Sequence, residues 1–498
     1  MKRKENDTAE PAREERRKTE HDAAALAQED IRKKENDAAV LTQEDIRKKE
    51  NGAMDLTQGD ILKSLAWFAA PILIGQLLQT LYNSVDSIVV GRFVGTSTLA
   101  AVTASATITQ VFVGFFNGMA AGASVVFSRN FGAGQYLDLK ESIHTAMTFS
   151  LLLGLIIAGL GVIAAPLLLH LVSCPDDVYA EALVYLRIYM GGALFMSLYN
   201  VGASVLRSVG NSRSPFWYLV TSSSMNIALD VLFVRGFRMG VAGVTVATVI
   251  AQFTSVALAF RKMMMADERY RFSFRELKIR GSLLGEIVRM GLPAGIQACV
   301  TSLSSMFLQR YINEFSSAAI AGIGSAMRID QFAGMPCNAL GLAMTTYIGQ
   351  NLGAKKPDRA RKGVWISLAA ACTMVVVVGI PSYFFAERLV GIFSSDPEVI
   401  QYGAGMLHVI MPVYLVMGFQ MLFGGIIRGY GYSQETMYMT LGGIVAVRQL
   451  WLAVALHFDH NIKWIYWGYP VGWGVTALLM LAFYLLVIQR KPLSEKGS

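Results

Sequence analysis

The chain has 498 residues, of which 53% are apolar and only 16% are charged, with 46 glycines and a formal net charge of +8. A soluble protein of this length normally carries about 25% charged residues, so the composition excludes an ordinary set of soluble domains. Apolar runs longer than about 18 residues recur almost to the end of the chain, which predicts a protein that crosses a membrane many times.

Residues 1–53 form a charged tail built on a 15-residue repeat, with the units EHDAAALAQEDIRKK (20–34), ENDAAVLTQEDIRKK (35–49) and ENGAMDLTQGDILKS (50–64). Each unit holds too few large apolar residues to bury a core, so we expect a disordered or loosely helical tail. A partner-binding or membrane-surface helix is the alternative. Duplication of an opening segment would explain the period and would make Met54 an earlier start of the chain.

Twelve apolar spans follow the tail. They cover residues 65–90, 99–127, 143–171, 180–206, 216–234, 241–263, 286–313, 318–347, 363–385, 399–427, 437–456 and 464–488. All are predicted to be helices, because a spanning backbone outside a closed barrel must satisfy its own hydrogen bonds. Prolines inside these spans favour kinks, since each removes a backbone bond, and they include Pro71, Pro293, Pro336 and Pro412. The predicted fold class is an all-α polytopic membrane protein with twelve transmembrane helices.

Loop charge predicts the orientation of these helices. If both ends of the chain are cytoplasmic, the inner loops carry most of the loop lysines and arginines, and the largest group runs from Arg261 to Arg280. This distribution satisfies the positive-inside rule. We therefore expect a protein of the bacterial or archaeal plasma membrane with both termini in the cytoplasm. The net positive charge is then a topology signal and calls for no nucleic-acid partner.

The second half of the chain repeats the first. NFGA at 130–133 returns as NLGA at 351–354, and RSVG at 207–210 returns as RGYG at 428–431. Both matches have the same offset in residue number, 221 (351 − 130 and 428 − 207), which we call the repeat offset. Asn117 returns as Asn338 at this offset, and Pro71 returns as Pro293 one residue out of step. Six spans in each half predict two lobes related by a pseudo-twofold axis along the membrane normal.

These features predict how the chain is divided. The predicted parts are the tail 1–53, a first lobe 54–263, a cytoplasmic linker 264–285, a second lobe 286–490 and a cytoplasmic tail 491–498.

No catalytic or nucleotide-binding motif is present in the sequence. It holds no Walker loop, no HExxH and no nucleophile elbow. The four cysteines stand far apart and are interpreted as packing residues: Cys174, Cys299, Cys337 and Cys372. The chain is therefore predicted not to be an enzyme and to need no cofactor. A transporter without a nucleotide motor must draw on an ion gradient, which requires an ion-binding group inside the membrane.

Acidic residues inside the spans are the first candidates for that group, because intramembrane carboxylates are costly and usually functional. Asp86 and Asp230 both lie about 6 Å from the outer ends of their helices, and Thr248 lies about 10 Å deep. Asn226 is one helical turn from Asp230, so both side chains can face one cavity. These residues are predicted to converge at one level of the first lobe.

Other polar residues inside the spans are further candidates for the ion-binding group or have a structural role. Asp330 and Arg328 are two positions apart and do not share a helix face, and Gln76 is a further candidate. The remaining charged or basic residues within spans are interpreted as packing, pairing or snorkelling groups: Arg187, Arg448 and His408.

From about Met54 to its end, the chain resembles the multidrug and toxic compound extrusion (MATE) transporters. The resemblance rests on PILIGQLLQTLYNSVDSIVVGRFVG (71–95), SRNFGAGQ (128–135), LRSVGNSRSPF (206–216), the Asn226/Asp230 pair, VAGVTVATVIAQ (241–252) and YIGQNLGAKK (347–356). It implies a twelve-helix antiporter with two lobes that expels cationic or amphipathic compounds in exchange for H⁺ or Na⁺.

The resemblance is to the DinF-like type, whose first helix carries a proline and an aspartate that match Pro71 and Asp86. It implies an ion-coupling site, open to H⁺ or Na⁺, at Asp86, Asn200, Asn226, Asp230 and Thr248, with Pro71 as a conformational hinge. NorM-like members add acids in the seventh and tenth helices. Those spans carry none in their interiors here, unless Glu314 at the outer end of the seventh is counted. Coupling is therefore expected in the first lobe, with Asp330 as a candidate to replace the missing charge.

The function predicted is a secondary active multidrug efflux antiporter. One alternative is a flippase for a lipid-linked sugar from the same superfamily, whose cavity would be strongly cationic. A second is a non-transporting membrane receptor or scaffold, which would not need acids at one depth on several helices. The expected partners are small cationic or amphipathic substrates and the lipid bilayer, and a monomer is expected.

Overall fold

The computed structural model describes residues 54–93, 96–268 and 270–490, and for residues 83, 85–93 and 96–99 it describes the backbone alone. The chain divides between Ala53 and Met54. The predicted tails 1–53 and 491–498 lie outside the described residues, so their predicted character stays a prediction.

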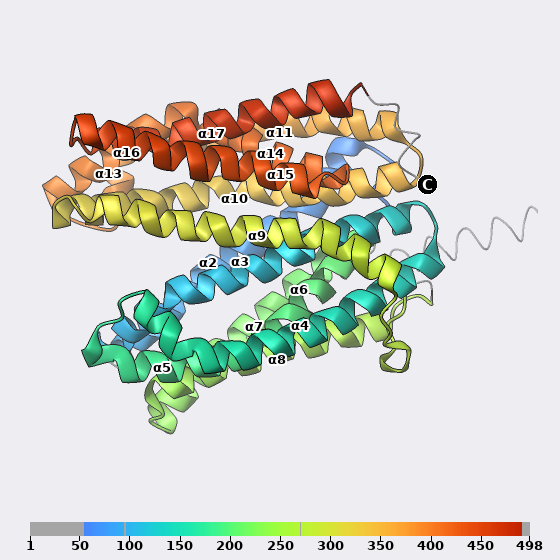
Figure 1. The fold of residues 1–498 in the computed structure, drawn as a ribbon, viewed down its shortest axis with the longest axis horizontal. Coiled ribbons are helices and arrows are strands. Elements are labelled where there is room, and N and C mark those ends of the chain that lie inside the picture. The colour runs from blue at the N-terminus through green and yellow to red at the C-terminus, as the bar shows by residue number, and fades with distance from the viewer. Residues whose placement is uncertain (1–53, 94–95, 269, 491–498) are drawn as a thin grey trace, which may run out of the picture. The chain divides into compact units, whose positions relative to one another are not determined.

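Every regular element among the described residues is helical (Figure 1). The first half contains α2 (Ile61–Phe93), α3 (Thr96–Gly132), α4 (Tyr136–Leu171), α5 (Asp176–Gly191), α6 (Ala193–Ser208), α7 (Arg213–Val231), the π-helix η1 (Leu232–Gly236) and α8 (Gly240–Met264). After the short η2 (Phe274–Glu276), the second half contains α9 (Gly281–Ile312), α10 (Ser317–Gly353), α11 (Pro357–Phe384), α12 (Ala386–Gly391), α13 (Pro397–Ile410), η3 (Met411–Val413), α14 (Tyr414–Gly429), α15 (Ser433–Thr440), the π-helix η4 (Leu441–Val447), α16 (Arg448–Phe458), α17 (Lys463–Phe483) and η5 (Tyr484–Ile488). Each of the twelve predicted spans coincides with one helix or with consecutive pieces of one, which confirms the fold class.

Ten of the described helices are long and apolar enough to cross a membrane, and α5 with α6, which meet at 44°, would make an eleventh. The exception is α10, although it has 37 residues. It packs against α2, α3, α11, α13 and α14, and most of its second half is buried. A helix enclosed by protein needs less apolar surface than one that faces lipid, so α10 can carry Gln350 and Asn351 in its core.

The two halves are built alike, residue by residue. The repeat offset carries the first residue of α3, Thr96, to the first residue of α10, Ser317, and it carries the last residue, Gly132, to Gly353. The same offset carries Gly210 to Gly431, and both glycines have φ of 89°, a backbone conformation that side chains rarely tolerate. Internal duplication therefore accounts for these matching helix bounds and for this turn.

The lobes meet first along α3 and α9, which make the most extensive helix–helix contact of the described chain. A Cβ atom on Gly118 would lie 2.3 Å from Ala294 O, and one on Gly122 would lie 2.1 Å from Met290 O. With Gly114, these glycines form a small-residue stripe that lets two membrane helices approach closely. The matching positions of α10 hold the larger Met335, Ala339 and Ala343, and the repeat-related contact of α10 with α2 is less extensive.

The second meeting point is a crossing of α3 and α10 at their C-terminal ends. A Cβ on Gly132 would lie 2.0 Å from Gln350 O, and one on Gly353 would lie 2.1 Å from Arg129 O. Gly132 and Gly353 are repeat partners, and so are Arg129 and Gln350. Such reciprocal contacts are what a twofold axis produces, so the pseudo-twofold axis passes through this crossing.

Residues 54–58, which we call the N-terminal strap, tie the two lobes together beside this crossing. In the first lobe, Gly210 O accepts a hydrogen bond from Met54 N–H (3.1 Å). In the second lobe, Gln350 Oε1 accepts one from Leu56 N–H (3.1 Å), and Asn351 Nδ2 donates to Leu56 O (3.2 Å). Leu56 is fully buried. The strap therefore contacts both lobes at once and closes this end of the molecule.

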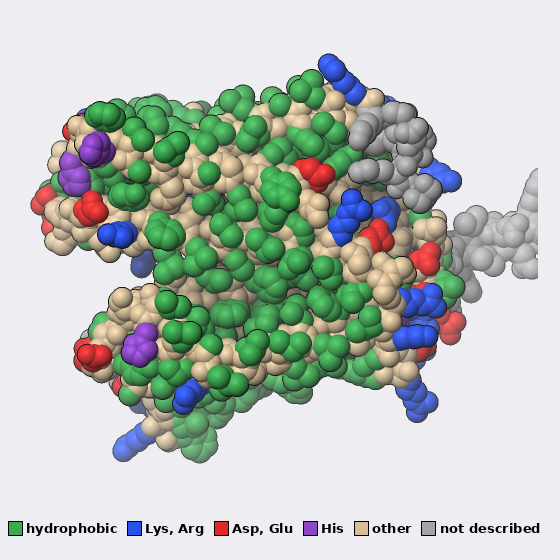
Figure 2. Space-filling view, in the orientation of Figure 1, with side chains coloured by type: hydrophobic (Ala, Val, Ile, Leu, Met, Phe, Trp, Pro, Cys, Tyr) green, Lys and Arg blue, Asp and Glu red, His purple; other side chains and the backbone are tan. Residues whose placement is uncertain are grey.

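The opposite end is open. Figure 2 shows the two bundles pressed together near the middle and toward the strap end, and a notch between them at the end that holds α5 and α13. We call this hollow the interlobe cleft. Leu56 and Ile488, which lie near the two ends of the described chain, belong to one hydrophobic core cluster at the closed end.

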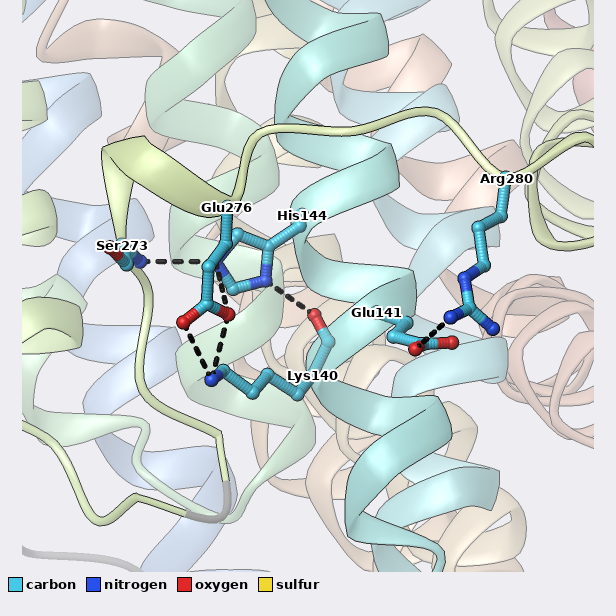
Figure 3. A network of polar contacts seen from close by, with 6 residues as sticks. All are labelled: Lys140, Glu141, His144, Ser273, Glu276 and Arg280. Carbon is cyan, nitrogen blue, oxygen red and sulfur yellow. Dashed lines mark hydrogen bonds and ion pairs between the residues drawn. The ribbon is translucent and has the colours of Figure 1, made fainter.

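The linker between the lobes is fastened to α4 by a polar network (Figure 3). Lys140 Nζ lies 2.9 and 2.7 Å from the two carboxylate oxygens of Glu276. Ser273 N–H donates to His144 Nε2 (3.0 Å), so the His144 ring carries its proton on Nδ1, which donates to Lys140 O (2.7 Å). The hydrogen bond from Lys140 lowers the pKa of Glu276 below its ordinary value. A further ion pair joins Glu141 and Arg280.

Candidate functional site

A buried carboxylate on α7 is the centre of the candidate site. Asp230 and Asn226 are both fully buried and lie one helical turn apart on the same face. The π-helix η1 begins at Leu232, two residues after Asp230. π-helical turns are rare and occur often at functional sites. The widened turn therefore follows directly on the acidic residue.

The amide of Asn226 joins three helices around this carboxylate. In the orientation that satisfies its neighbours, Nδ2 donates to Tyr82 Oη (2.7 Å) and to Asp230 Oδ2 (3.0 Å). Its Oδ1 accepts from the backbone N–H of Thr248 (3.0 Å). Helices α2, α7 and α8 thus meet at one amide and one acid, as the predicted convergence of Asn226, Asp230 and Thr248 requires.

Two other predicted residues make contacts within their own helices. The Thr248 hydroxyl donates to Val244 O (3.1 Å), so Thr248 enters the cluster mainly through its backbone. Asn200 on α6 is half-buried, and its Nδ2 donates to Met196 O (2.9 Å). No hydrogen bond between Asn200 and the Asn226–Asp230 pair is found among the described residues.

The first helix supplies the remaining candidates of this lobe. Asp86 falls on α2 one turn after Tyr82, and its side chain lies outside the described residues. Pro71 lies inside α2, three helical turns before Tyr82. Between them, the side-chain oxygen of Gln76 is buried and has no hydrogen-bond partner among the described residues.

Asp330 and Arg328 belong to the other lobe, on α10. The Asp330 backbone carbonyl accepts from Tyr414 Oη (2.8 Å), whereas its Oδ1 is buried without a hydrogen-bond partner within the described part of the chain. Arg328 is exposed, with its guanidinium 5.8 Å from the ring centre of Phe393. Neither residue joins the cluster around Asp230.

The internal repeat shows that this cluster exists in one lobe only. The repeat offset leads from Asp86, Asn200, Asn226, Asp230 and Thr248 to Phe307, Met421, Val447, Trp451 and Tyr469. None of these second-lobe side chains carries a carboxylate or an amide. The two lobes share a fold, but at these positions the chemistry of an ion-binding site is present in the first lobe alone.

Tyr82 is the site residue that sequence reasoning missed. It contacts Asn226 directly and lies four residues before Asp86 in the motif LYNSVD. That i, i+4 spacing places both residues on one face of α2, and it could have indicated Tyr82 from the sequence. A tyrosine among many aromatic residues of a membrane helix offered no other signal.

The cluster combines a carboxylate, an amide and a tyrosine hydroxyl. Protonation of Asp230 would add an O–H donor to the carboxyl group and remove its negative charge, which would weaken the hydrogen bond that Oδ2 accepts from Asn226 Nδ2. Carboxylate, amide and hydroxyl oxygens are also the ligands that hard cations prefer. Among the described residues, no group of three or more His, Cys, Asp or Glu side chains that could hold a metal ion was found.

Comparison with known proteins supplies the family. The family model MatE matches residues 71–232 and 293–449, once in each half of the chain. The chain belongs to the MatE family. Its resemblance to the MATE transporters is thereby confirmed, and the double match follows the internal repeat.

Relatives and solved structures cover nearly the whole MatE region of the chain. "Probable multidrug resistance protein YoeA" of Bacillus subtilis is 27% identical over 450 residues, which are 87% of this chain and 95% of that protein. "FAD transporter" of Shewanella oneidensis is 25% identical over 84% of this chain and 92% of its own. A structure described as "Outward-facing conformation of a multidrug resistance MATE family transporter of the MOP superfamily" superposes with a TM-score of 0.81 at 22% identity, covering 87% of this chain and 97% of the other.

The family and the apolar helices together show a membrane transporter of small molecules, and the MATE fold has twelve helices in two lobes. Neither of these two relatives carries a name that implies catalysis.

Proposed function

We propose that this protein is an antiporter of the cytoplasmic membrane that expels amphipathic or cationic compounds while H⁺ or Na⁺ enters. The observation that carries the proposal is the fully buried Asp230, joined through Asn226 to Tyr82 on α2. A buried carboxylate in a membrane helix is costly, and this one is connected to a second helix that carries Pro71. Ion binding at Asp230 can therefore alter the conformation of α2.

Loop charge supports cytoplasmic termini. With that orientation the strap end of the molecule faces the cytoplasm and the interlobe cleft opens outward. An ion that reaches Asp230 from outside would neutralise the carboxylate and weaken its hydrogen bond with Asn226 Nδ2, and this change would pass to Tyr82, the other acceptor of that amide. We propose that α2 then bends near Pro71, that substrate leaves the cleft, and that the lobes reopen on the strap side.

The energetics are sufficient for uphill export. One pH unit supplies about 1.4 kcal/mol per proton, and 100 mV supplies about 2.3 kcal/mol per charge moved. The pH term alone supports about a tenfold substrate gradient, since a factor of ten costs about 1.4 kcal/mol, and the potential adds to it only when the exchange moves net charge.

The test uses purified protein in liposomes with ethidium as the cationic probe. Wild-type protein should move ethidium against its gradient when a pH or a Na⁺ gradient is imposed, and the effective gradient identifies the ion. Asp230→Asn should abolish coupled movement, and so should Asp86→Asn. The matched control is Glu398→Gln, an exposed acid in the first turn of α13, which should behave as wild type.

The proposal fails if neither a pH gradient nor a Na⁺ gradient drives ethidium movement by the wild-type protein. It also fails if Asp230→Asn keeps full coupling. Survival of coupling in Asp86→Asn alone would remove Asp86 from the site and leave Asp230 as the sole coupling acid of the first lobe.

A flavin nucleotide is a second candidate substrate. The relative of S. oneidensis is named a FAD transporter, and Arg328 on α10 is an exposed cation in the second lobe that suits a phosphate. If the flavin is the better substrate, liposomes that contain the protein should accumulate FAD from the medium under the imposed gradient, and ethidium should not inhibit this accumulation. Arg328→Gln would then lower FAD transport and leave ethidium transport unchanged.

A further inference from the structure

The repeat places exposed amide side chains on both central helices of the molecule. On α3, Gln110 and Asn117 are exposed, and on α10 their repeat partners Gln331 and Asn338 are exposed as well. Most other side chains along these two helices are buried or half-buried. An exposed amide within a membrane-spanning helix is costly against lipid. These four side chains are therefore expected to face an aqueous space.

Helix geometry shows which space that is. Residues 110, 117 and 128 of α3 are separated by 7 and 11 positions, close to two and three helical turns, so they lie on one stripe. Ser128 at the end of this stripe contacts α10, because a Cβ on Gly349 would lie 2.1 Å from Ser128 Oγ. Gly349 is the repeat partner of Ser128, and it ends the matching stripe of Gln331 and Asn338 on α10. The two stripes thus face each other across the lobe junction.

The stripes touch at the closed end and separate along the helices. Asn117 lies about 16 Å from Ser128 along α3, at about 1.5 Å per residue, and Gln110 lies about 27 Å away. Figure 2 shows the lobes apart at the end that holds α5 and α13, which is the end toward which the stripes run from the crossing. Because Asn117 and Asn338 are exposed and lie on facing stripes, we infer that they line the deeper part of the interlobe cleft, with the two glutamines nearer its mouth.

We propose that Asn117 and Asn338 are the substrate-binding residues of this transporter and that they select an aromatic amphiphile with a hydrogen-bonding group at each end. This inference rests on the proposed function and extends it to the substrate class. Two identical amides related by a pseudo-twofold axis offer the same donor and acceptor from both sides. A ligand with two polar ends bonds to both lobes at once, whereas a ligand without hydrogen-bonding groups gains nothing from them.

The amides also differ in kind from the ion site. Each carries no charge and offers both a donor and an acceptor, so selection depends on hydrogen bonding and shape and is insensitive to the sign of the substrate charge. The stripe contains no carboxylate on either helix between Gln110 and Ser128 or between Gln331 and Gly349.

The test compares two monocations of similar aromatic bulk. Ethidium carries an amino group at each end of a planar ring system, and tetraphenylphosphonium carries no hydrogen-bonding group. Binding of each to purified protein in nanodiscs, and transport of each in liposomes, are measured for wild type, Asn117→Ala, Asn338→Ala and the double variant. Gln401→Ala is the control, since Gln401 is an exposed amide on α13 away from both stripes.

Each single variant should weaken ethidium binding about fivefold, because a hydrogen bond contributes about that factor, and the double variant should weaken it about 25-fold if the sites act independently. Tetraphenylphosphonium should bind all variants within twofold of wild type. The binding assay separates this inference from the proposed function, since a protein that binds ethidium in this pattern without coupled transport refutes only the antiport.

Three results overturn the inference. They are wild-type protein that binds ethidium no more tightly than tetraphenylphosphonium, a double variant that keeps ethidium affinity within twofold, and an equal loss of both probes. The last result would show that the substitutions disturb the cleft as a whole.

Discussion

Tyr82 is the contact through which α2 can sense the state of Asp230. Its hydroxyl accepts from Asn226 Nδ2 at 2.7 Å. Tyr82→Phe removes that acceptor and leaves the buried amide with one partner fewer, at a cost of about 1 kcal/mol. We expect transport to persist, with the ion concentration for half-maximal rate shifted about fivefold. The same shift in the control Tyr438→Phe, an exposed tyrosine on α15, would show that the effect is not specific to the Asn226 contact.

Protonation of Glu276 should release the linker from α4. Because Lys140 lowers the pKa of Glu276 in the folded protein, this contribution to stability is present above the unfolded pKa of about 4.3 and is lost as pH falls through the lowered value. The protection factors of the linker amides in residues 270–280, which are exchange rates corrected for the intrinsic rate at each pH, should therefore fall on acidification from about pH 6 to about pH 3.

Glu276→Gln provides the comparison for this experiment. Two other basic groups face the Glu276 carboxylate, His144 (Nε2 to Oε2 3.9 Å) and Arg271. Low protection factors in Glu276→Gln at both pH values attribute the release to the carboxylate. High protection factors in that variant at pH 6 would contradict the prediction.

At the scale of single residues, the sequence predicted the cluster from the distance of each polar residue to the outer end of its helix. Asn226, Asp230 and Thr248 lie together as their spacing from the helix ends indicates. That argument could not foresee that Thr248 takes part through its backbone N–H, nor that Asn200 turns back to Met196 O. Those outcomes depend on the rotamers of polar side chains and on tertiary neighbours, which no spacing encodes.

At the scale of helices, the glycine stripe of α3 makes a direct prediction. Gly118→Val should prevent α3 from approaching α9, because the new Cβ would lie 2.3 Å from the backbone oxygen of Ala294. Overpacking of this kind typically costs about 1–3 kcal/mol or more. The melting temperature of the detergent-purified protein should fall by several degrees, or folded protein should not be recovered.

Gly159→Ala is the matched control, because a Cβ added to Gly159 on α4 meets nothing within 4 Å. It should melt within about a degree of wild type, or slightly above it, since alanine favours a helix over glycine. Equal losses in both variants would mean that the stripe has no special role in joining the lobes.

The helices themselves were largely predictable because apolar length and the internal repeat act together. Two features escaped this reasoning. The span 180–206 is broken at Gly192, where a Cβ would lie 2.7 Å from Val249 Cγ2, so close packing on α8 makes the bend. The π-helical turns η1 and η4 arise from local hydrogen-bond slippage, which apolar periodicity does not report.

For the molecule as a whole, the strap is predicted to hold the lobes closed on its side. Gln350 is its main anchor, since Oε1 accepts from Leu56 N–H and Nε2 donates to Ser208 O (2.7 Å). Gln350→Ala removes both bonds, which at about 1 kcal/mol each shifts the open-to-closed ratio about 30-fold. Spin labels are placed at Leu137 and Asp358, which are exposed repeat partners in the first turns of α4 and α11. We expect the distribution of distances between the two labels to shift toward longer values in this variant.

The spin-label experiment starts from protein in which the four free cysteines have been replaced. Gln401→Ala again serves as the control. A distance distribution that is the same in Gln350→Ala and wild type would show that the strap does not hold this end closed. The sequence alone predicted the two lobes and their axis, but not the strap, because residues 54–58 look like part of a tail repeat unit and carry no pattern that indicates burial.

The crossing of α3 and α10 has a consequence for the origin of the chain. Gly132 touches Gln350 while Gly353 touches Arg129, and this reciprocity is the arrangement by which two identical subunits pair. A six-helix ancestor with one such glycine and one such helix end already possessed a surface complementary to itself. Fusion of two copies would then have preserved a homodimer in a single chain, and only afterwards could the two lobes come to differ, with Asp86 and Asp230 in one opposite Phe307 and Trp451 in the other.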